Sequence, residues 1–461
     1  MCLTIPGKIL EINEGKATVK SSRETAQIDL GLVFGAKKGD WILYATNRAV
    51  KVISEQDAKE IIELLEDNYN PVNIDNLPLK FKKIIYKVRT GKHDLTRDEI
   101  VYLLNLKGKD NLETLYAEAN FLRKDRIDDF VCIHGIIEFS NYCKNNCLYC
   151  GIRKDQNIQH YRMFKDEIVE TAVKAVEEEG YKLLVLQSGE DGFYSDEDLL
   201  DIVKTIKKKA RVFVFLSVGE RSAEFYKKAF KVGATGSLCR FETSNPDLYA
   251  RMRPGHKLDD RIQLIRKQKK QGYYMATGSL IGLPQQSLED IADDILMIKK
   301  LRVPMISSGP FLPARGTPLE NFQFKIFPHF DGIPPEAVTN LKSISNEKMI
   351  NEKINDQWKM RNEKLLELTL KYIAISRFVM PDIKIPVTTA LETIDKENGR
   401  HRALLAGANA LMFNLTPDKY GEQYRIYDNK YREREKVWQK YGLFKGEESY
   451  DMLEQRLKII L

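Results

Sequence analysis

Three cysteines within eight positions constrain this 461-residue chain more than any other feature. They stand in the stretch Cys143-Lys-Asn-Asn-Cys147-Leu-Tyr-Cys150. Three thiolates can bind three irons of a cubane 4Fe–4S cluster, which leaves the fourth iron without a protein ligand. An open iron can take the amino and carboxylate groups of a small molecule. The triplet therefore predicts a site for one such cluster, with Cys143, Cys147 and Cys150 as its ligands.

The same triplet allows two other interpretations. It could be part of a structural zinc site in which His134 or His160 supplies the fourth ligand. It could also hold an ordinary ferredoxin-like cluster. Structural zinc sites usually use paired CxxC knuckles, and the sequence contains no second pair of this kind.

Composition limits the partners that this chain is expected to have. The hydrophobic fraction is 43% and the charged fraction 30%, which is typical of a soluble globular protein. There is no apolar run of about 18 residues and no signal peptide pattern at the start, so we expect a cytoplasmic protein without a membrane partner. The net charge is +7, but basic residues are often interleaved with acidic ones and no nucleic-acid motif is visible.

The first 66 residues predict a small β-barrel with one helix. The helix is expected from about Ser54 to Glu66, with Ser54 as its N-cap. Residues 67–79 are rich in Asn, Pro and Asp and predict a linker. The expected strands, separated by turn signals, are Leu10–Ile12, Ala17–Lys20, Ala26–Leu30 and Asp40–Tyr44.

Residues 80–461 predict a second, α/β domain. Short apolar runs alternate with longer amphipathic stretches, which favours βα units and a closed (βα)8 barrel. A Lys-, Asn- and Glu-rich insertion near residues 322–360 predicts a surface loop with a helical part. The expected strands are Ile133–Phe139, Leu183–Gln187, Val212–Ser217, Ser237–Phe241, Met275–Leu280, Met305–Ser308, Val387–Ala390 and Ala410–Phe413.

Polar residues follow most of these strands, and in such barrels the chemistry lies at the C-terminal strand ends. Arg240 and Glu242 are expected on one face of a strand, because strand side chains repeat every two residues. Packing alone does not explain polar groups at several successive strand ends, although Arg240 and Glu242 could form only a rim ion pair. The other groups are Gln187-Ser188-Gly189-Glu190-Asp191, Ser217-Val218-Gly219-Glu220, Gly278 to Pro284, and Thr388-Thr389.

The CxxxCxxC spacing, with Tyr149 just before the last cysteine, resembles the radical S-adenosylmethionine signature. The resemblance implies that the open iron chelates S-adenosylmethionine, and that one electron cleaves it to methionine and a 5′-deoxyadenosyl radical. It also implies that Glu242 contacts the ribose and that Arg240 and Arg261 lie near the methionyl end. The remaining cofactor-binding residues implied are Tyr149, Gln187, Ser188, Gly189, Glu190, Ser217 and Met305.

From about Lys80 to Tyr427 the chain is similar to the HydE family, the radical maturases of iron–iron hydrogenase. The resemblance implies a substrate, a small iron complex that holds cysteine, two carbonyls and a cyanide. It further implies a substrate cavity lined by Thr388, Thr389, Tyr424 and Tyr427, an electron donor such as ferredoxin or flavodoxin, and other hydrogenase maturases as partners. We expect one cluster only, because no second cysteine group is present. The matching stretches are Ile137–Ser140, Leu186–Asp191, Arg240–Pro246, Gly278–Pro284, Gly309–Pro313 and Ile385–Ala390.

The opening Met1 to Lys8, with Gly39 to Leu43, resembles the HypC/HupF family of nickel–iron hydrogenase maturation chaperones. Cys2 matches the family cysteine that helps to carry an iron centre with carbon monoxide and cyanide. Ala45 stands where the family has a histidine, so a second iron contact is missing. Cys2 could equally be a scaffold residue or a protein contact. The fusion suggests that this domain delivers or receives an iron unit, or recruits a partner maturase.

Two alternatives of function stay open at this stage. Related barrel enzymes build biotin, methylornithine or a pyridinol cofactor from organic substrates, and they share the cluster and much of the cofactor site. A non-catalytic scaffold could carry iron complexes in both domains without forming a radical.

Overall fold

The computed structural model describes residues 5–59, 73–320, 347–430 and 446–460, apart from positions 14, 22–24, 32, 34, 46–47 and 128. The chain forms two compact units, a small one that runs to Asn73 and a large one that begins at Ile74. No helix within the described residues is long and apolar enough to cross a membrane.

The small unit is a closed five-stranded barrel in the order β1-β2-β3-β5-β4. Its interior holds alternate residues of the strands, such as Ala17 and Val19 of β2. The sequence prediction missed the last strand, β5, in which Val50, Lys51 and Val52 are all exposed, so that apolar and polar residues do not alternate as they do in a half-buried strand. Residues 55–59 are helical, and the Ser54 hydroxyl accepts a hydrogen bond from the Asp57 amide at 3.0 Å, which confirms the N-cap. The strands are β1 (Ile5–Asn13), β2 (Lys16–Ser21), β3 (Thr25–Asp29), β4 (Trp41–Ala45) and β5 (Arg48–Ile53).

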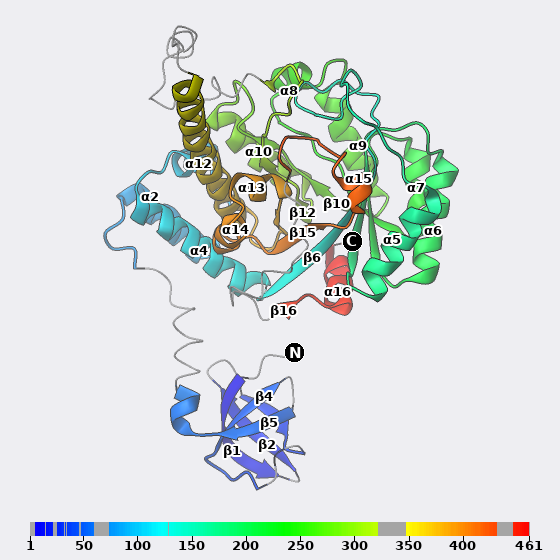
Figure 1. Cartoon of the computed structure of the whole chain (residues 1–461). Coiled ribbons are helices and arrows are strands. Elements are labelled where there is room, and N and C mark those ends of the chain that lie inside the picture. Colours follow the sequence, from blue (N-terminus) through cyan, green and yellow to red (C-terminus); the bar gives the residue numbers. More distant parts are fainter. Residues whose placement is uncertain are drawn as a thin grey trace. The chain divides into compact units, whose positions relative to one another are not determined.

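The large unit contains the predicted parallel barrel of eight strands, in the order β12-β10-β9-β8-β7-β6-β15-β14 (Figure 1). The ring closes through a bridge between Met305 and Lys384, where the Ile306 amide donates to the Lys384 carbonyl at 2.9 Å. The strands are β6 (Phe130–Ser140), β7 (Leu183–Ser188), β8 (Phe213–Ser217), β9 (Ala234–Leu238), β10 (Tyr274–Thr277), β12 (Met305–Ile306), β14 (Pro386–Val387) and β15 (Ala410–Asn414).

Helices cover the outside of this ring (Figure 1). Several of their N-termini carry side-chain caps; for example, Ser195 and Asp198 form a capping box at the start of α6. The helices are α2 (Leu79–Arg89), α3 (Arg97–Leu104), α4 (Lys109–Ile127), α5 (Lys165–Glu177), α6 (Asp196–Lys209), α7 (Ala223–Lys231), α8 (Pro246–Met252), α9 (Leu258–Lys270), α10 (Leu288–Leu301), α12 (Glu347–Val379), α13 (Thr389–Ile394), α14 (Gly399–Leu405), α15 (Asp418–Gly421) and α16 (Tyr450–Ile460).

Four predicted strands, now β9, β10, β12 and β14, end two or three residues earlier than expected, and two of these corrections concern the site. β9 stops at Leu238, so Arg240 and Glu242 lie in the loop after it and not on a strand face. β14 stops at Val387, and Thr388 is the N-cap residue of α13. The predicted insertion falls partly outside the described residues, since 321–346 are not described, while 347–360 form the beginning of α12.

A C-terminal segment that the sequence analysis left unassigned packs against the start of β6. The short strand β16 (Gly446–Glu447) pairs with β6, and the Glu448 amide donates to the Val131 carbonyl at 2.9 Å. The Glu448 carboxylate accepts from the Lys384 ammonium at 2.8 Å, and both side chains are almost fully buried. The segment therefore closes the N-terminal end of the barrel, opposite the predicted site.

Candidate active site

The C-terminal strand ends surround one cavity of about 270 Å³. Of the predicted cofactor and substrate residues, the cavity wall contains Tyr149, Gln187, Ser188, Gly189, Glu190, Ser217, Arg240, Glu242, Arg261, Thr388, Thr389, Tyr424 and Tyr427, together with the cluster ligands Cys147 and Cys150. The third predicted ligand, Cys143, lies beside the cavity, against Gly189.

The cysteine loop follows β6 and is held from three sides by backbone hydrogen bonds. The Lys144 amide donates to the Glu190 carbonyl at 3.1 Å, in the loop after β7. The Leu148 amide donates to the Met252 carbonyl at 2.9 Å, at the end of α8. The Gly151 amide donates to the Ile426 carbonyl at 3.0 Å, near the end of the large unit. Distant parts of the chain thus fix the loop that carries the three thiols.

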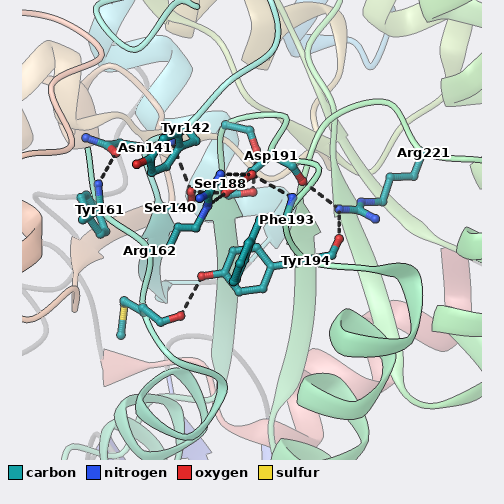
Figure 2. A network of polar contacts seen from close by, with 12 residues as sticks. Ser140, Asn141, Tyr142, Tyr161, Arg162, Ser188, Asp191, Phe193, Tyr194 and Arg221 are labelled. Carbon is teal, nitrogen blue, oxygen red and sulfur yellow. Dashed lines mark hydrogen bonds and ion pairs between the residues drawn. The ribbon is translucent and has the colours of Figure 1, made fainter. Parts of the chain in front are cut away.

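Asp191 anchors the outer side of this loop (Figure 2). Its carboxylate accepts from the Ser140 hydroxyl at 2.7 Å and from the Arg162 guanidinium at 2.7 and 2.9 Å. Burial opposes ionisation of Asp191, but these donors hold the pKa of its carboxyl below the usual value. The Arg162 guanidinium also lies over the rings of Tyr142 and Phe193, at 3.7 and 4.5 Å from their centroids. The network ties β6, the cysteine loop and the β7 loop into one rigid block.

Glycines allow the β7 and β8 loops to approach the cysteines closely. A Cβ atom at Gly189 would lie 2.1 Å from the Tyr142 carbonyl oxygen and 2.9 Å from the Cys143 Cβ. Gly219 has a φ of +77°, and a Cβ there would overlap the Glu190 side chain. Only glycine fits at both positions.

The structural zinc alternative is wrong for this arrangement. Among the residues that the structure describes, no three His, Cys, Asp or Glu side chains are placed to hold one metal ion. His134 lies at the start of β6, 3.2 Å from the Cys132 sulfur, and its buried ring has a pKa lowered to about 3. The His160 ring stacks on Tyr142. A cubane differs from zinc because its three thiolates bind three separate irons.

Burial controls the protonation of the three thiols. It raises the pKa of Cys147 to about 12, with a further contribution from the nearby Glu242 carboxylate, and it also raises the pKa of Cys143 and Cys150. The thiols are therefore protonated in the metal-free chain at neutral pH. Iron binding must release these protons, as it does for cysteine sites in general.

Three acidic and four basic side chains line the cavity, and five of them, Glu190, Glu242, Arg240, Arg253 and Arg261, belong to the predicted cofactor side. Glu242 has a φ of +64°, a conformation that is unfavourable for a residue with a Cβ, and its carboxylate lies 3.3 Å from Arg240. Arg240 and Glu242 are thus close together, as predicted. A loop and not the face of a strand brings them together. Arg253 lies 3.8 Å from Glu190, while Arg261 donates to Glu220 at 2.7 Å and to the Cys239 sulfur at 3.0 Å.

Several buried polar atoms of this wall have no hydrogen-bond partner within the described protein. They are Glu190 Oε2, Glu242 Oε2, Arg253 Nε, Arg261 Nε and Thr388 Oγ1. Buried polar groups are normally satisfied, so this set is suited to a polar ligand. Two carboxylates fit an amino group and a ribose diol, and a guanidinium fits a carboxylate. The residues present therefore fit S-adenosylmethionine beside a cluster on the three cysteines.

The predicted role of Met305 in the cavity is wrong. Met305 is 1% exposed and packs in the barrel core with Leu183, Phe213, Tyr274 and Cys132, which come from the first halves of their strands. Its position at the start of a two-residue strand places it too early in the chain to reach the rim. Ser307 and Gly309 line the cavity from the same segment.

Some wall residues were not expected from the sequence. Cys239, which carried no prediction, lines the cavity beside Arg261. Glu138, Asn414 and Lys430 form a second buried polar group, on the side of Thr389 and Tyr427. Glu138 and Asn414 occupy the ends of neighbouring strands, so the rule that placed the other candidates could have found them. Cys2, the possible iron contact, lies outside the described residues.

Comparison of the sequence with known proteins identifies the family of this chain. Residues 137–298 match the model of the radical SAM superfamily, and residues 1–65 match the model of the HupF/HypC family. The [FeFe] hydrogenase maturase subunit HydE of Thermotoga maritima is 38% identical over 340 residues, which cover 74% of this chain and 86% of that protein. The chain belongs to the HydE family. It is thus a radical S-adenosylmethionine enzyme with an additional HupF/HypC domain, and a 4Fe–4S cluster and S-adenosylmethionine are the cofactors of its superfamily.

Methylornithine synthase is a second relative of this HydE family member. The 3-methylornithine synthase of Methanosarcina barkeri is 29% identical and covers 77% of this chain and 90% of that protein. The crystal structure of a methylornithine synthase has a TM-score of 0.62 at 27% identity and covers 82% of this chain and 96% of that one. The family assignment makes the non-catalytic scaffold the weaker alternative.

Proposed function

We propose that this enzyme acts on a cysteine-bound iron complex with two carbonyls and a cyanide, in the maturation of [FeFe] hydrogenase. The observation that carries the proposal is the cavity in which the cysteine loop, the carboxylates of Glu190 and Glu242 and a second polar group meet. The similarity to a HydE protein along most of the large unit supports this substrate over others.

The protein's residues have distinct parts in this proposal. Cys143, Cys147 and Cys150 hold one 4Fe–4S cluster whose fourth iron stays open, and the bound cluster supplies the electron for reductive cleavage of S-adenosylmethionine. Glu190 accepts from the amino group and Glu242 from the ribose, while Arg240 or Arg261 pairs with the carboxylate. Tyr149, Gln187, Ser188, Gly189 and Ser217 complete the cofactor wall. Thr388, Thr389, Tyr424 and Tyr427 shape the space for the substrate.

The enclosed wall also protects the reaction. Tyr424 and Tyr427 are almost fully buried, and the Tyr427 hydroxyl and the Thr389 hydroxyl are 2.6 Å apart. Such a wall excludes water and holds reactive species away from the solvent. The cytoplasmic location and an electron donor such as ferredoxin or flavodoxin belong to the same proposal.

The test uses anaerobically reconstituted, reduced protein. Its EPR spectrum is recorded with and without S-adenosylmethionine, and 5′-deoxyadenosine is then assayed with the synthetic cysteine–iron–dicarbonyl–cyanide complex. We expect a shifted cluster signal and turnover that depends on the complex. A shifted signal with no response to the complex would contradict the proposed substrate and leave the radical enzyme intact.

An organic substrate is the second candidate, favoured by the similarity to methylornithine synthase along most of both chains. In that case 5′-deoxyadenosine formation would respond to an amino acid and not to the iron complex. The same assay with a panel of amino acids separates the two functions.

We further propose that residues 1–66 form a separate domain, joined through residues 67–79 to the enzyme domain of residues 80–461. In this proposal the small domain hands over an iron–carbonyl–cyanide unit, with Cys2 as one contact, or recruits another hydrogenase maturase. Deleting residues 1–66 should then spare S-adenosylmethionine cleavage but slow hydrogenase maturation. Unchanged maturation by the truncated protein would refute the delivery role.

A further inference from the structure

Glu138 and Lys430 form a buried ion pair in the cavity wall, where Glu138 is the cross-strand neighbour of Gln187. Their side chains are 2% and 5% exposed. Glu138 lies two residues before the end of β6 and five residues before the first cluster cysteine, whereas Lys430 is the last residue of the described stretch 347–430. Two opposite charges in such a place require a reason, because the desolvation of a buried pair can exceed its attraction.

Neighbouring groups hold Glu138 firmly in position. Its second carboxylate oxygen accepts from the Asn414 amide at 2.7 Å. Its backbone amide donates to the Thr416 hydroxyl at 2.8 Å, and its carbonyl accepts from the Tyr161 hydroxyl at 2.6 Å. The carboxylate is thus a fixed point of the wall, as expected of a group that positions a ligand.

Lys430 is placed to meet a ligand from two directions. It lines the enclosed cavity and also a second cavity of about 620 Å³, together with Tyr424. Its ammonium lies 4.8 Å from the centroid of the Tyr424 ring, which offers a second favourable contact for the cation. The remaining wall of the second cavity comes from loop residues such as Gln156, Gly316 and Asp428.

The other charged groups of this region already have a use. Glu190, Arg253, Glu220 and Arg261 are linked to one another and lie next to the cysteine loop, where S-adenosylmethionine fits. The Glu138–Lys430 pair is not needed for that cofactor. Nearby, Thr388 Oγ1 is buried in the wall without a hydrogen-bond partner, which leaves a further polar contact for a second ligand.

We propose that Lys430 and Glu138 form an amino-acid subsite, in which Lys430 binds the carboxylate of the substrate and Glu138 binds its ammonium group. The subsite rests on the proposed function, where the cysteine of the iron complex supplies both groups. The charge balance supports it. Without substrate, the charges of Lys430 and Glu138 neutralise each other. A zwitterion bound between them would offer its carboxylate to Lys430 and its ammonium group to Glu138. No net charge is buried by this exchange, so its cost is small compared with that of an isolated ion.

The test measures equilibrium binding to full-length, reconstituted protein in the presence of S-adenosylmethionine. Two probes are compared, the synthetic cysteine–iron–dicarbonyl–cyanide complex and the corresponding cysteamine complex, which lacks the carboxylate. We expect the wild type to bind the cysteine complex at least about 10-fold more tightly, as the loss of one charged hydrogen-bonded contact implies. Lys430→Met should remove this preference by weakening the cysteine complex alone.

Two further variants show whether a loss of binding comes from a disturbed fold and not from the loss of the subsite. Lys430→Met leaves a buried carboxylate unpaired, so the double variant Lys430→Met with Glu138→Gln removes both charges and keeps the wall neutral. It should fold, bind S-adenosylmethionine normally and show no preference between the probes. Lys154→Met removes an exposed lysine and should behave as the wild type. Equal binding of both probes by the wild type, or equal weakening of both by Lys430→Met, would overturn the proposal.

Free L-cysteine and L-ornithine separate this inference from the proposed function. If the wild type ignores the iron complex but binds an amino acid in a way that Lys430→Met abolishes, the proposed substrate fails and the subsite stands. If it binds neither the complex nor any amino acid, both fail.

Discussion

The Arg162 guanidinium lies flat over the Tyr142 ring while two of its nitrogens donate to Asp191. Tyr142 immediately precedes the first cluster cysteine, and Asp191 follows Glu190 in the neighbouring loop. One side chain therefore couples the metal-binding loop to the loop that carries a predicted cofactor contact. We therefore expect the geometry of the cysteine loop to depend on this side chain.

Replacing Arg162 by Gln should lower both stability and iron content. Asp191 is 3% exposed and would lose a bidentate charged partner, which costs about 2–4 kcal/mol in the free energy of unfolding. Urea denaturation and iron analysis after reconstitution measure the two effects. Arg126→Gln is the matched control, since its bidentate pair with Asp382 is exposed and should change stability by less than about 1 kcal/mol. Equal effects of the two variants would contradict the anchoring role.

Gly189→Ala should abolish cluster assembly in a chain that still folds. The new methyl group would lie 2.1 Å from the Tyr142 carbonyl oxygen, so the cysteine loop must move. Visible absorption and iron content of the reconstituted protein, together with circular dichroism, report on this. Gly192→Ala serves as the control, because a Cβ there meets nothing within 4 Å. A normal cluster in the Gly189→Ala protein would show that the loop is not held as the structure has it.

Glu242 gives a prediction in which function and stability move in opposite directions. Glu242→Gln keeps the backbone at φ +64° but removes the carboxylate charge, so the affinity for S-adenosylmethionine should fall about 10-fold or more. Glu242→Gly should weaken binding as well, yet raise the free energy of unfolding by about 1 kcal/mol by relieving the backbone strain. Equilibrium binding to iron-loaded protein and urea denaturation of the metal-free protein test the two parts. Unaltered affinity in both variants would remove Glu242 from the cofactor site.

The buried carboxyl of Asp294 leads us to expect that the free energy of unfolding depends on pH. Burial raises the pKa of its carboxyl to about 7, with repulsion from Asp290 acting in the same direction, although Ser244 and Gln286 donate to it. Because the folded pKa lies above the unfolded value of about 4, the contribution of Asp294 to stability is complete below pH 4 and is lost as the pH rises through 7.

Asp294→Asn isolates this contribution. The difference in unfolding free energy between wild type and variant should fall by about 2 kcal/mol from pH 5 to pH 7, at about 1.4 kcal/mol per pH unit. Urea denaturation at several pH values measures it. A difference that is constant with pH would mean that Asp294 is ionised throughout.

The buried pair of Lys384 and Glu448 predicts a strong dependence on the C-terminal segment. Lys384→Met leaves the Glu448 carboxylate buried without its cation, so the free energy of unfolding should fall by about 3–5 kcal/mol. Asp451→Asn breaks an exposed pair with Arg211 in the same segment and should cost less than about 1 kcal/mol. Thermal and urea denaturation of both variants decide the matter, and similar losses would contradict a closing role for Glu448.

Periodicity and the strand-end rule were enough to predict the barrel and the polar groups at its strand ends, whereas Tyr424 and Tyr427 were expected only from the resemblance to the HydE family. The alternation of apolar and amphipathic stretches fixes the strands within a few residues, and the cysteine spacing is local. The prediction for Met305 was wrong because its strand has only two residues. So short a strand has no periodic pattern that would show whether Met305 lies in the barrel core or at the C-terminal rim. Glu242 was assigned to a strand because nothing in the sequence reveals a positive φ at a residue other than glycine. Lys430 and Glu448 were missed because their partners are far away in the chain.

The pairing of β6 with β15 has a consequence for the order of chain synthesis and cluster insertion in the cell. The strand β6, which leads to the cysteines, pairs along one edge with Ala410–Asn414 of β15. These residues are synthesised more than 260 residues later. A nascent chain that has just exposed Cys150 therefore lacks a wall of its own metal pocket, and the Gly151 amide has no Ile426 carbonyl to bind. We therefore expect cluster insertion to follow the synthesis of Ala410–Asn414 and Ile426, when the ring can close.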